Sequence, residues 1–132
     1  MRFELVDAVL EQSDEHIVTV KNVSMAEEYL ADHFPDFPVL PGVMMLEAMV
    51  QAARRLLAGR PDAPGGPWVL AEARNVRYGN MVRPGQQLRL TVQWAKCDNG
   101  RHTFKGSGEV DGQSALQARF VLRRATTGAA EQ

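Results

Sequence analysis

Residues 43–57 read VMMLEAMVQAARRLL, a stretch rich in Ala, Leu and Met. These residue types favour a helix over a strand. The apolar side chains occupy nearly every side of that helix, so it should be buried rather than lie on the surface. A helix of this length is roughly 22 Å long, enough to cross a small domain.

Alternating apolar and polar residues predict strands on both sides of this helix. Leu88, Leu90 and Val92 share one face at a spacing of two, and the Asn-Gly pair at 99–100 and the Asp-Gly pair at 111–112 favour tight hairpin turns. We expect antiparallel strands at residues 17–23, 68–78, 88–96, 101–110 and 114–123. The sequence therefore predicts an α+β fold, an antiparallel β-sheet wrapped around a long central α-helix.

The 132 residues are 45% hydrophobic, which suits one domain, expected over residues 1–124. Gly and Pro concentrate at residues 58–67 and predict a flexible connection, and residues 125–132 predict a flexible C-terminal tail. No apolar run is long enough to span a membrane, and no basic leader precedes an apolar core, so we expect a soluble cytoplasmic protein. Cys97 is the only cysteine, which leaves no disulfide framework.

Charge is distributed unevenly along the chain. Residues 1–47 hold ten acidic and two basic side chains, whereas residues 48–132 hold six acidic and 13 basic ones. The basic half could form a face for an acidic partner, or the two halves could simply compensate each other on folding. No Lys/Arg run is interleaved with aromatic residues, so we expect no binding of nucleic acid.

The carboxylate of Glu47 lies within the apolar helix, and Gln51 follows one turn later on the same face. Burying a carboxylate is costly, so a structural hydrogen bond, a salt bridge or a catalytic acid must account for it.

Just upstream, residues 33–42 read HFPDFPVLPG. The three prolines exclude a regular helix and place His33 on a rigid, extended segment that leads to the helix. Gly42 falls at the helix start, where backbone N–H groups are free. These parts could remove a proton next to a carbonyl and expel a β-hydroxyl group.

The run HFPDFPVLPGVMMLEAMVQ, residues 33–51, closely resembles the 3-hydroxyacyl-[acyl carrier protein] dehydratases of bacterial fatty acid synthesis. Similarity continues through NVRYGNMVRPGQQLRLTV and GSGEVDGQSALQARFVL. The resemblance implies a hot-dog fold and dehydration to the trans-2-enoyl product without cofactor or metal. A short chain with Glu at position 47 is similar to the elongation dehydratases, so no isomerase activity is expected.

The resemblance also implies roles for particular residues. His33 matches the base that takes the α-proton, and Glu47 matches the acid that protonates the departing hydroxyl. Gly42 matches the glycine whose N–H binds the thioester carbonyl, and Gln51 matches the residue that supports the acid. The expected substrate-binding residues are Phe34, Gly42, Val43 and Gln51.

The implied partner is an acyl carrier protein bearing the 3-hydroxyacyl thioester. This carrier is acidic and would suit the basic half of the chain, with Arg77, Arg83 and Arg101 as candidate contacts. His and Glu meet across a dimer interface in this family, so a homodimer is expected, with a hexamer of three dimers as a further possibility.

Two departures from the family pattern lie beside the base: Asp36 stands where most members have Gly, and Phe37 where most have a small or polar residue.

A hot-dog thioesterase and a non-catalytic acyl-thioester-binding subunit stay open as alternatives. The 14-residue spacing of His33 and Glu47 favours elimination, and the presence of both ionisable residues disfavours a binding module. His16 and His102 are expected to be surface or packing residues.

Overall fold

The computed structural model describes residues 4–24, 40–63 and 66–125. Its elements follow the chain in the order β1 (Ala8–Gln12), β2 (His16–Asn22), α2 (Gly42–Ala58), β3 (Trp68–Tyr78), β4 (Gln87–Asp98), β5 (Arg101–Val110) and β6 (Gln113–Arg124). The helix and the five expected strands are confirmed, with ends that differ by at most two residues. Strand β1 was not predicted, because all five of its residues are exposed and show no alternation of burial.

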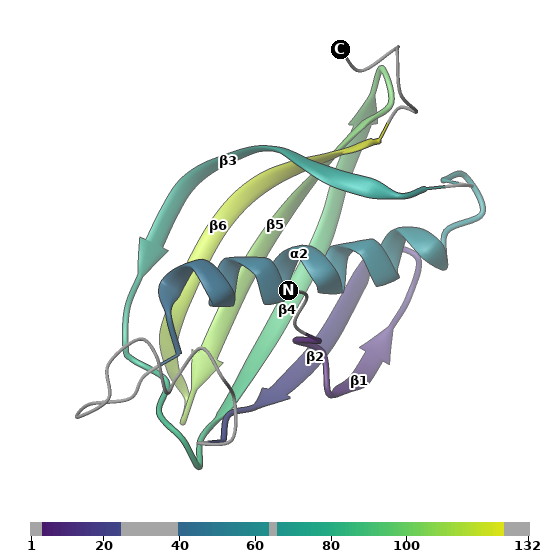
Figure 1. The fold of residues 1–132 in the computed structure, drawn as a ribbon. Coiled ribbons are helices and arrows are strands. Elements are labelled where there is room, and N and C mark those ends of the chain that lie inside the picture. Colours follow the sequence, from purple (N-terminus) through teal and green to yellow (C-terminus); the bar gives the residue numbers. More distant parts are fainter. Residues whose placement is uncertain (1–3, 25–39, 64–65, 126–132) are drawn as a thin grey trace.

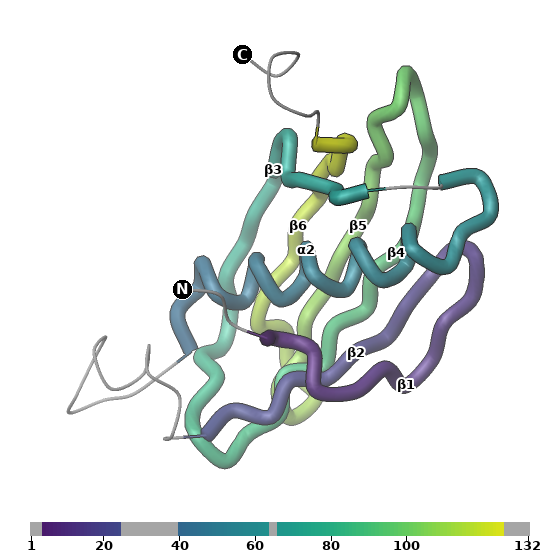
Figure 2. The backbone as a smooth tube through the Cα atoms, turned by 45° about the vertical axis from the view of Figure 1, so that its right-hand side comes forward, coloured from purple at the N-terminus to yellow at the C-terminus, as the bar shows by residue number. Residues whose placement is uncertain are grey.

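The six strands form one antiparallel sheet in the order β1-β2-β4-β5-β6-β3. The helix lies between β2 and β3 in the sequence and crosses the sheet, so that β3 reaches the edge opposite β1 (Figure 1). The sheet curves around the helix, as the tube in Figure 2 shows. This is the predicted arrangement of a sheet wrapped around a central helix.

Both predicted hairpin turns are present. Asn99 and Gly100 have φ values of 54° and 77°, and Asp111 and Gly112 have φ values of 52° and 78°. Two consecutive positive φ values are the requirement of the two-residue turn whose twist matches that of paired strands. The turns therefore set the register of β4 with β5 and of β5 with β6.

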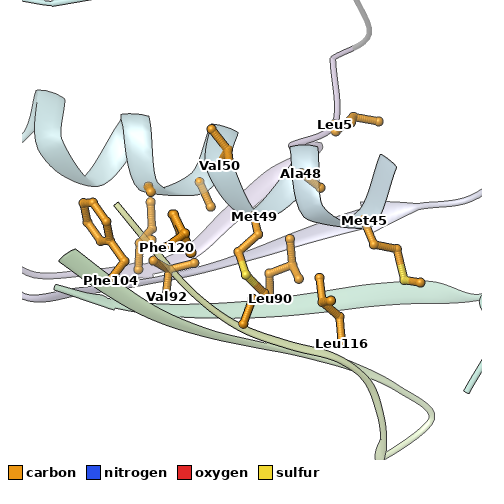
Figure 3. Packing of buried hydrophobic residues seen from close by; sticks show 14 of the residues in the cluster. Leu5, Met45, Ala48, Met49, Val50, Leu90, Val92, Phe104, Leu116 and Phe120 are labelled. Atoms are coloured by element: carbon orange, nitrogen blue, oxygen red, sulfur yellow. The ribbon is translucent and has the colours of Figure 1, made fainter. Parts of the chain in front are cut away.

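The core lies between α2 and the concave face of the sheet (Figure 3). Its fully buried members include Ala48, Met49, Leu56, Leu57, Leu88, Leu90, Val92, Phe104, Leu116 and Phe120. Met49 approaches β5 at Gly106 so closely that any Cβ at this position would overlap its thioether sulfur. Glycine at position 106 thus allows the helix to pack directly on the strand.

His102, the second residue of β5, is buried beside two tryptophans. His102 is only 3% exposed, and its Nδ1 accepts a hydrogen bond from Trp94 Nε1 at 2.9 Å. The ring of Trp68 meets it edge to face, with centroids 5.0 Å apart. Burial lowers the pKa of His102. The nearby carboxylate of Asp62 raises this pKa, and the guanidinium of Arg60 lowers it further. The expectation that His102 is a packing residue is confirmed.

The lowered pKa of His102 predicts that acid destabilises the fold. The unfolded chain binds this proton near pH 6.5 and the folded chain only at lower pH, so the free energy of unfolding should fall as pH drops below about 6.5. Protonation would also make Nδ1 a donor and remove the bond from Trp94. Urea unfolding between neutral and mildly acidic pH measures the effect. His102→Phe should flatten this dependence, whereas His16→Gln, a change at a more exposed histidine, should retain it; equal slopes in all three proteins would contradict the assignment.

The connection after the helix is tied to the sheet at its described start. The guanidinium of Arg60 stacks on the Trp94 ring, 3.7 Å from its centroid, and binds Asp62 at 2.8 Å. At the other end of the connection, Pro67 O accepts a hydrogen bond from the N–H of Ala125 at 2.7 Å. Residues 126–132 of the predicted flexible tail lie outside the described residues. Within the described part of the chain, no helix is both long and apolar enough to cross a membrane.

Candidate active site

Three polar side chains share one face of α2. Glu47, Gln51 and Arg54 follow one another at spacings of four and three residues, which places them along the same side of a helix. Gln51 Nε2 donates a hydrogen bond to Glu47 Oε2 at 3.1 Å, and Arg54 Nη1 lies 3.5 Å from the same oxygen. The predicted pairing of Gln51 with Glu47 is therefore present in the structure.

Gln51 is fixed from its other end as well. Its Oε1 accepts a hydrogen bond from the backbone N–H of Leu5 at 2.8 Å. Because the two ends of the amide have different partners, its oxygen and nitrogen cannot exchange places without losing both bonds. The amide nitrogen is thus directed at Glu47.

Glu47 is less buried than the sequence predicted. Its side chain is 42% exposed in the single chain, although the neighbouring Ala48 and Met49 are completely buried. The prediction of a buried carboxylate is wrong for the isolated chain, because the polar face of α2 points away from the sheet core. The apolar composition of the helix does not reveal which face the sheet leaves uncovered.

A groove runs beside this polar face. Its volume is about 610 Å³, and it is lined by Glu4, Glu47, Gln51, Arg54, Arg55, Pro67, Trp68 and Val69. The lining combines two carboxylates and two guanidinium groups with the partly apolar start of β3. Glu47 therefore borders a space in which a substrate or a second polypeptide could lie.

The helix begins beside a tyrosine at the end of β3. A Cβ on Gly42 would lie 2.8 Å from Tyr78 Cε1, so glycine lets the ring lie against the first turn. Pro41 is the N-cap residue, and its carbonyl accepts the N–H groups of Met44 and Met45. No described residue accepts the N–H groups of Gly42 and Val43, and the Val43 side chain is 69% exposed. Within the described part of the chain, these two N–H groups are therefore without an acceptor at the positive end of the helix dipole.

The remaining predicted residues fall into two groups. His33, Phe34, Asp36 and Phe37 lie outside the described residues. Among the candidate carrier contacts, Arg101 pairs with Glu72 at 3.2 Å, while Arg77 lies on β3 and Arg83 in the turn before β4.

Arg54 was missed by the sequence analysis. It lies seven residues after Glu47, a spacing of about two helical turns that could have indicated a shared face. The feature that gives it a fixed position is tertiary: Arg54 Nε donates a hydrogen bond to the backbone carbonyl of Trp68 at 2.7 Å. No pattern within the helix predicts that partner.

The arrangement of one antiparallel sheet around a central helix is the hot-dog fold, and solved structures of that class resemble it. The dehydratase heterocomplex ApeI:P from Xenorhabdus doucetiae matches with a TM-score of 0.74 and 20% identity, over 94% of this chain and 84% of that one. Thioesterase superfamily member 2 from Mus musculus matches with a TM-score of 0.68 and 13% identity, over 86% of this chain and 78% of that one. Identities this low support the shared fold alone, and the predicted fold class is confirmed.

Sequence comparison identifies the family. Residues 9–117 match the ApeI-like family, described as ApeI dehydratase, and the chain belongs to this family. A 3-hydroxyacyl-[acyl-carrier-protein] dehydratase FabZ of Lactococcus lactis subsp. cremoris is 38% identical over 91% of this chain and 83% of its own length. The corresponding protein of Streptococcus pyogenes serotype M5 is 39% identical over 89% of this chain and 85% of its own length. The resemblance and the enzyme class predicted from the sequence, a dehydratase, are confirmed.

Proposed function

We propose that the protein removes water from 3-hydroxyacyl thioesters carried on an acyl carrier protein and releases the trans-2-enoyl thioester. The observation that carries the proposal is the placement of Glu47. Its carboxylate borders a groove, is oriented by Gln51, and stands on a helix whose first N–H groups have no acceptor among the described residues. The named activity of the FabZ relatives supports the same reaction.

In the proposed reaction, His33 takes the proton from the α-carbon while the double bond forms between the α- and β-carbons. The bond from the β-carbon to the hydroxyl oxygen breaks, and Glu47 supplies the proton that makes the leaving group water. The N–H of Gly42 donates to the thioester oxygen, on which negative charge develops. A proton returned from His33 to Glu47 restores the starting state, and Phe34 and Val43 border the substrate.

We propose further that the active unit is a homodimer. Strand β3 is an edge of the sheet, and edge strands present unpaired N–H and C=O groups that favour pairing with another chain. The apolar side chains of Leu70 and Tyr78 on β3 are 39% and 51% exposed. A partner protomer would cover this edge, enclose the half-exposed Glu47, and supply its own His33. The hexamer and the cytoplasmic location stay predictions.

The proposal is tested by mixing the purified protein with 3-hydroxyacyl carrier-protein substrates of several chain lengths and recording absorbance of the conjugated enoyl thioester. We expect the signal to appear for at least one chain length. Release of free carrier thiol without enoyl product would favour the thioesterase alternative. Binding of the acyl carrier without either product would favour the acyl-binding subunit, and both results would contradict the proposed dehydration.

A further inference from the structure

We propose that Arg54 is a positioning residue for the elimination, acting through Glu47. This inference rests on the proposed function and extends it to a residue for which the family resemblance gave no role. It starts from an asymmetry in the contacts of the Glu47 carboxylate. Both Gln51 and Arg54 contact Oε2, whereas no described residue hydrogen-bonds to Oε1.

That asymmetry gives the two oxygens different tasks. Oε2 is held by an amide on one side and a guanidinium on the other, which fixes the rotation of the carboxyl group. Oε1 is left to exchange a proton with the hydroxyl of the substrate. Because Oε2 has two partners, the carboxyl group keeps its orientation while Oε1 exchanges the proton.

Arg54 can hold the carboxylate because it is itself anchored. Its Nε donates to Trp68 O at 2.7 Å, so the guanidinium is fixed between the helix and the first residue of β3. Its side chain is 38% exposed, compared with 48% for the adjacent Arg55. A guanidinium presents several N–H groups in one plane, which lets Arg54 serve the carbonyl and the carboxylate together.

The charge of Arg54 acts mainly in the transition state. When Glu47 gives its proton to the leaving hydroxyl, negative charge grows on the carboxylate, and the guanidinium 3.5 Å away stabilises that charge. An interaction that strengthens as the reaction proceeds raises kcat, whereas one equally strong before the reaction changes KM. Arg54 should therefore affect kcat much more than KM.

Arg55 provides a matched control. It is the next residue of the same helix, it lines the same groove, and its Nη2 also lies 3.5 Å from a carboxylate oxygen, that of Glu4. Its position differs in one respect that matters, because it contacts Glu4 instead of Glu47. Removal of the positive charge from either arginine affects the groove as a whole, so that effect should appear in variants of both Arg54 and Arg55. An effect that acts through Glu47 should appear only in the Arg54 variant.

The experiment compares steady-state kinetics of Arg54→Gln, Arg54→Lys and Arg55→Gln with the unaltered protein, after thermal melting has shown that each is folded. Arg54→Gln should lower kcat about tenfold with little change in KM, since one hydrogen bond to a charged group is lost. Arg54→Lys should recover part of the loss, because an ammonium can reach Glu47 but lacks the planar array that also binds Trp68 O. Arg55→Gln should keep kcat close to that of the unaltered protein, and any general effect of the charge lost from the groove should appear in its KM.

Several outcomes would overturn the inference. These are an unchanged kcat in Arg54→Gln, an equal loss in Arg55→Gln, or a rise in KM alone. If Arg54→Gln does not fold, the comparison of Arg54→Lys with Arg55→Gln decides, and a normal kcat in the lysine variant would reject the need for a planar anchor. An unaltered protein that is silent with every substrate would instead reject the proposed function, and with it any catalytic effect of Arg54.

Discussion

Glu47→Gln should reduce kcat by roughly 10²- to 10⁴-fold, the range expected when a general acid is removed. Gln has nearly the same shape as Glu and can still accept a hydrogen bond from Gln51 through its oxygen, but it has no proton to give to the leaving hydroxyl. The stability cost should be small, because the Glu47–Arg54 pair is partly exposed on both sides and such pairs contribute about 0–1 kcal/mol. Enoyl absorbance and thermal melting measure the two effects separately.

Glu4→Gln is the control for this prediction. Glu4 lines the same groove and pairs with Arg55, so its replacement removes the same charge from the same space. It should leave turnover close to that of the unaltered protein. Normal turnover in Glu47→Gln, or equal losses in both variants, would reject Glu47 as the acid.

Gly106→Val should destabilise the fold by about 3 kcal/mol, the upper part of the range for forcing side-chain volume into a packed core. The new Cβ would overlap the side chain of Met49, which is completely buried in the core. Either the Met49 thioether would have to take another rotamer within the packed core, or the helix would have to move away from β5 and loosen its contacts with the sheet. The melting temperature should fall by roughly 10 °C for a domain of this size.

Ser107→Val is the matched control for the glycine prediction. Ser107 is the next residue of β5 and lies on the exposed outer face of the sheet, where a valine fits the strand without meeting the core. Its melting temperature should stay near that of the unaltered protein. Equal melting temperatures for the two valine variants would show that Met49 yields easily and that Gly106 does not set the approach of the helix.

Much of the fold could be predicted because its signals are local. The Ala, Leu and Met content of residues 43–57 predicts a buried helix, and the structure places α2 at Gly42–Ala58. The bounds of β5 match the prediction because an Asn-Gly turn and an Asp-Gly turn enclose it. Strand β1 lacked any such signal, since its place depends on pairing with β2 instead of on burial of its own side chains.

The site was predicted less completely because its contacts are tertiary. The pairing of Glu47 with Gln51 follows from helical spacing, and it is present. The exposure of Glu47 depends on which helix face the sheet covers, and the anchor of Arg54 depends on a carbonyl from β3. Neither could be obtained from the residues of the helix alone.

The most direct test of the account mixes two inactive variants, His33→Ala and Glu47→Gln, under conditions that let protomers exchange. If each site combines His33 of one protomer with Glu47 of the other, half of the dimers will be mixed and each will regain one of its two sites, so about a quarter of the unaltered activity should return. Each variant alone should show at most about one hundredth of the unaltered activity in the enoyl absorbance assay. No recovery after proven exchange, with an active unaltered protein, would contradict a site built from two protomers.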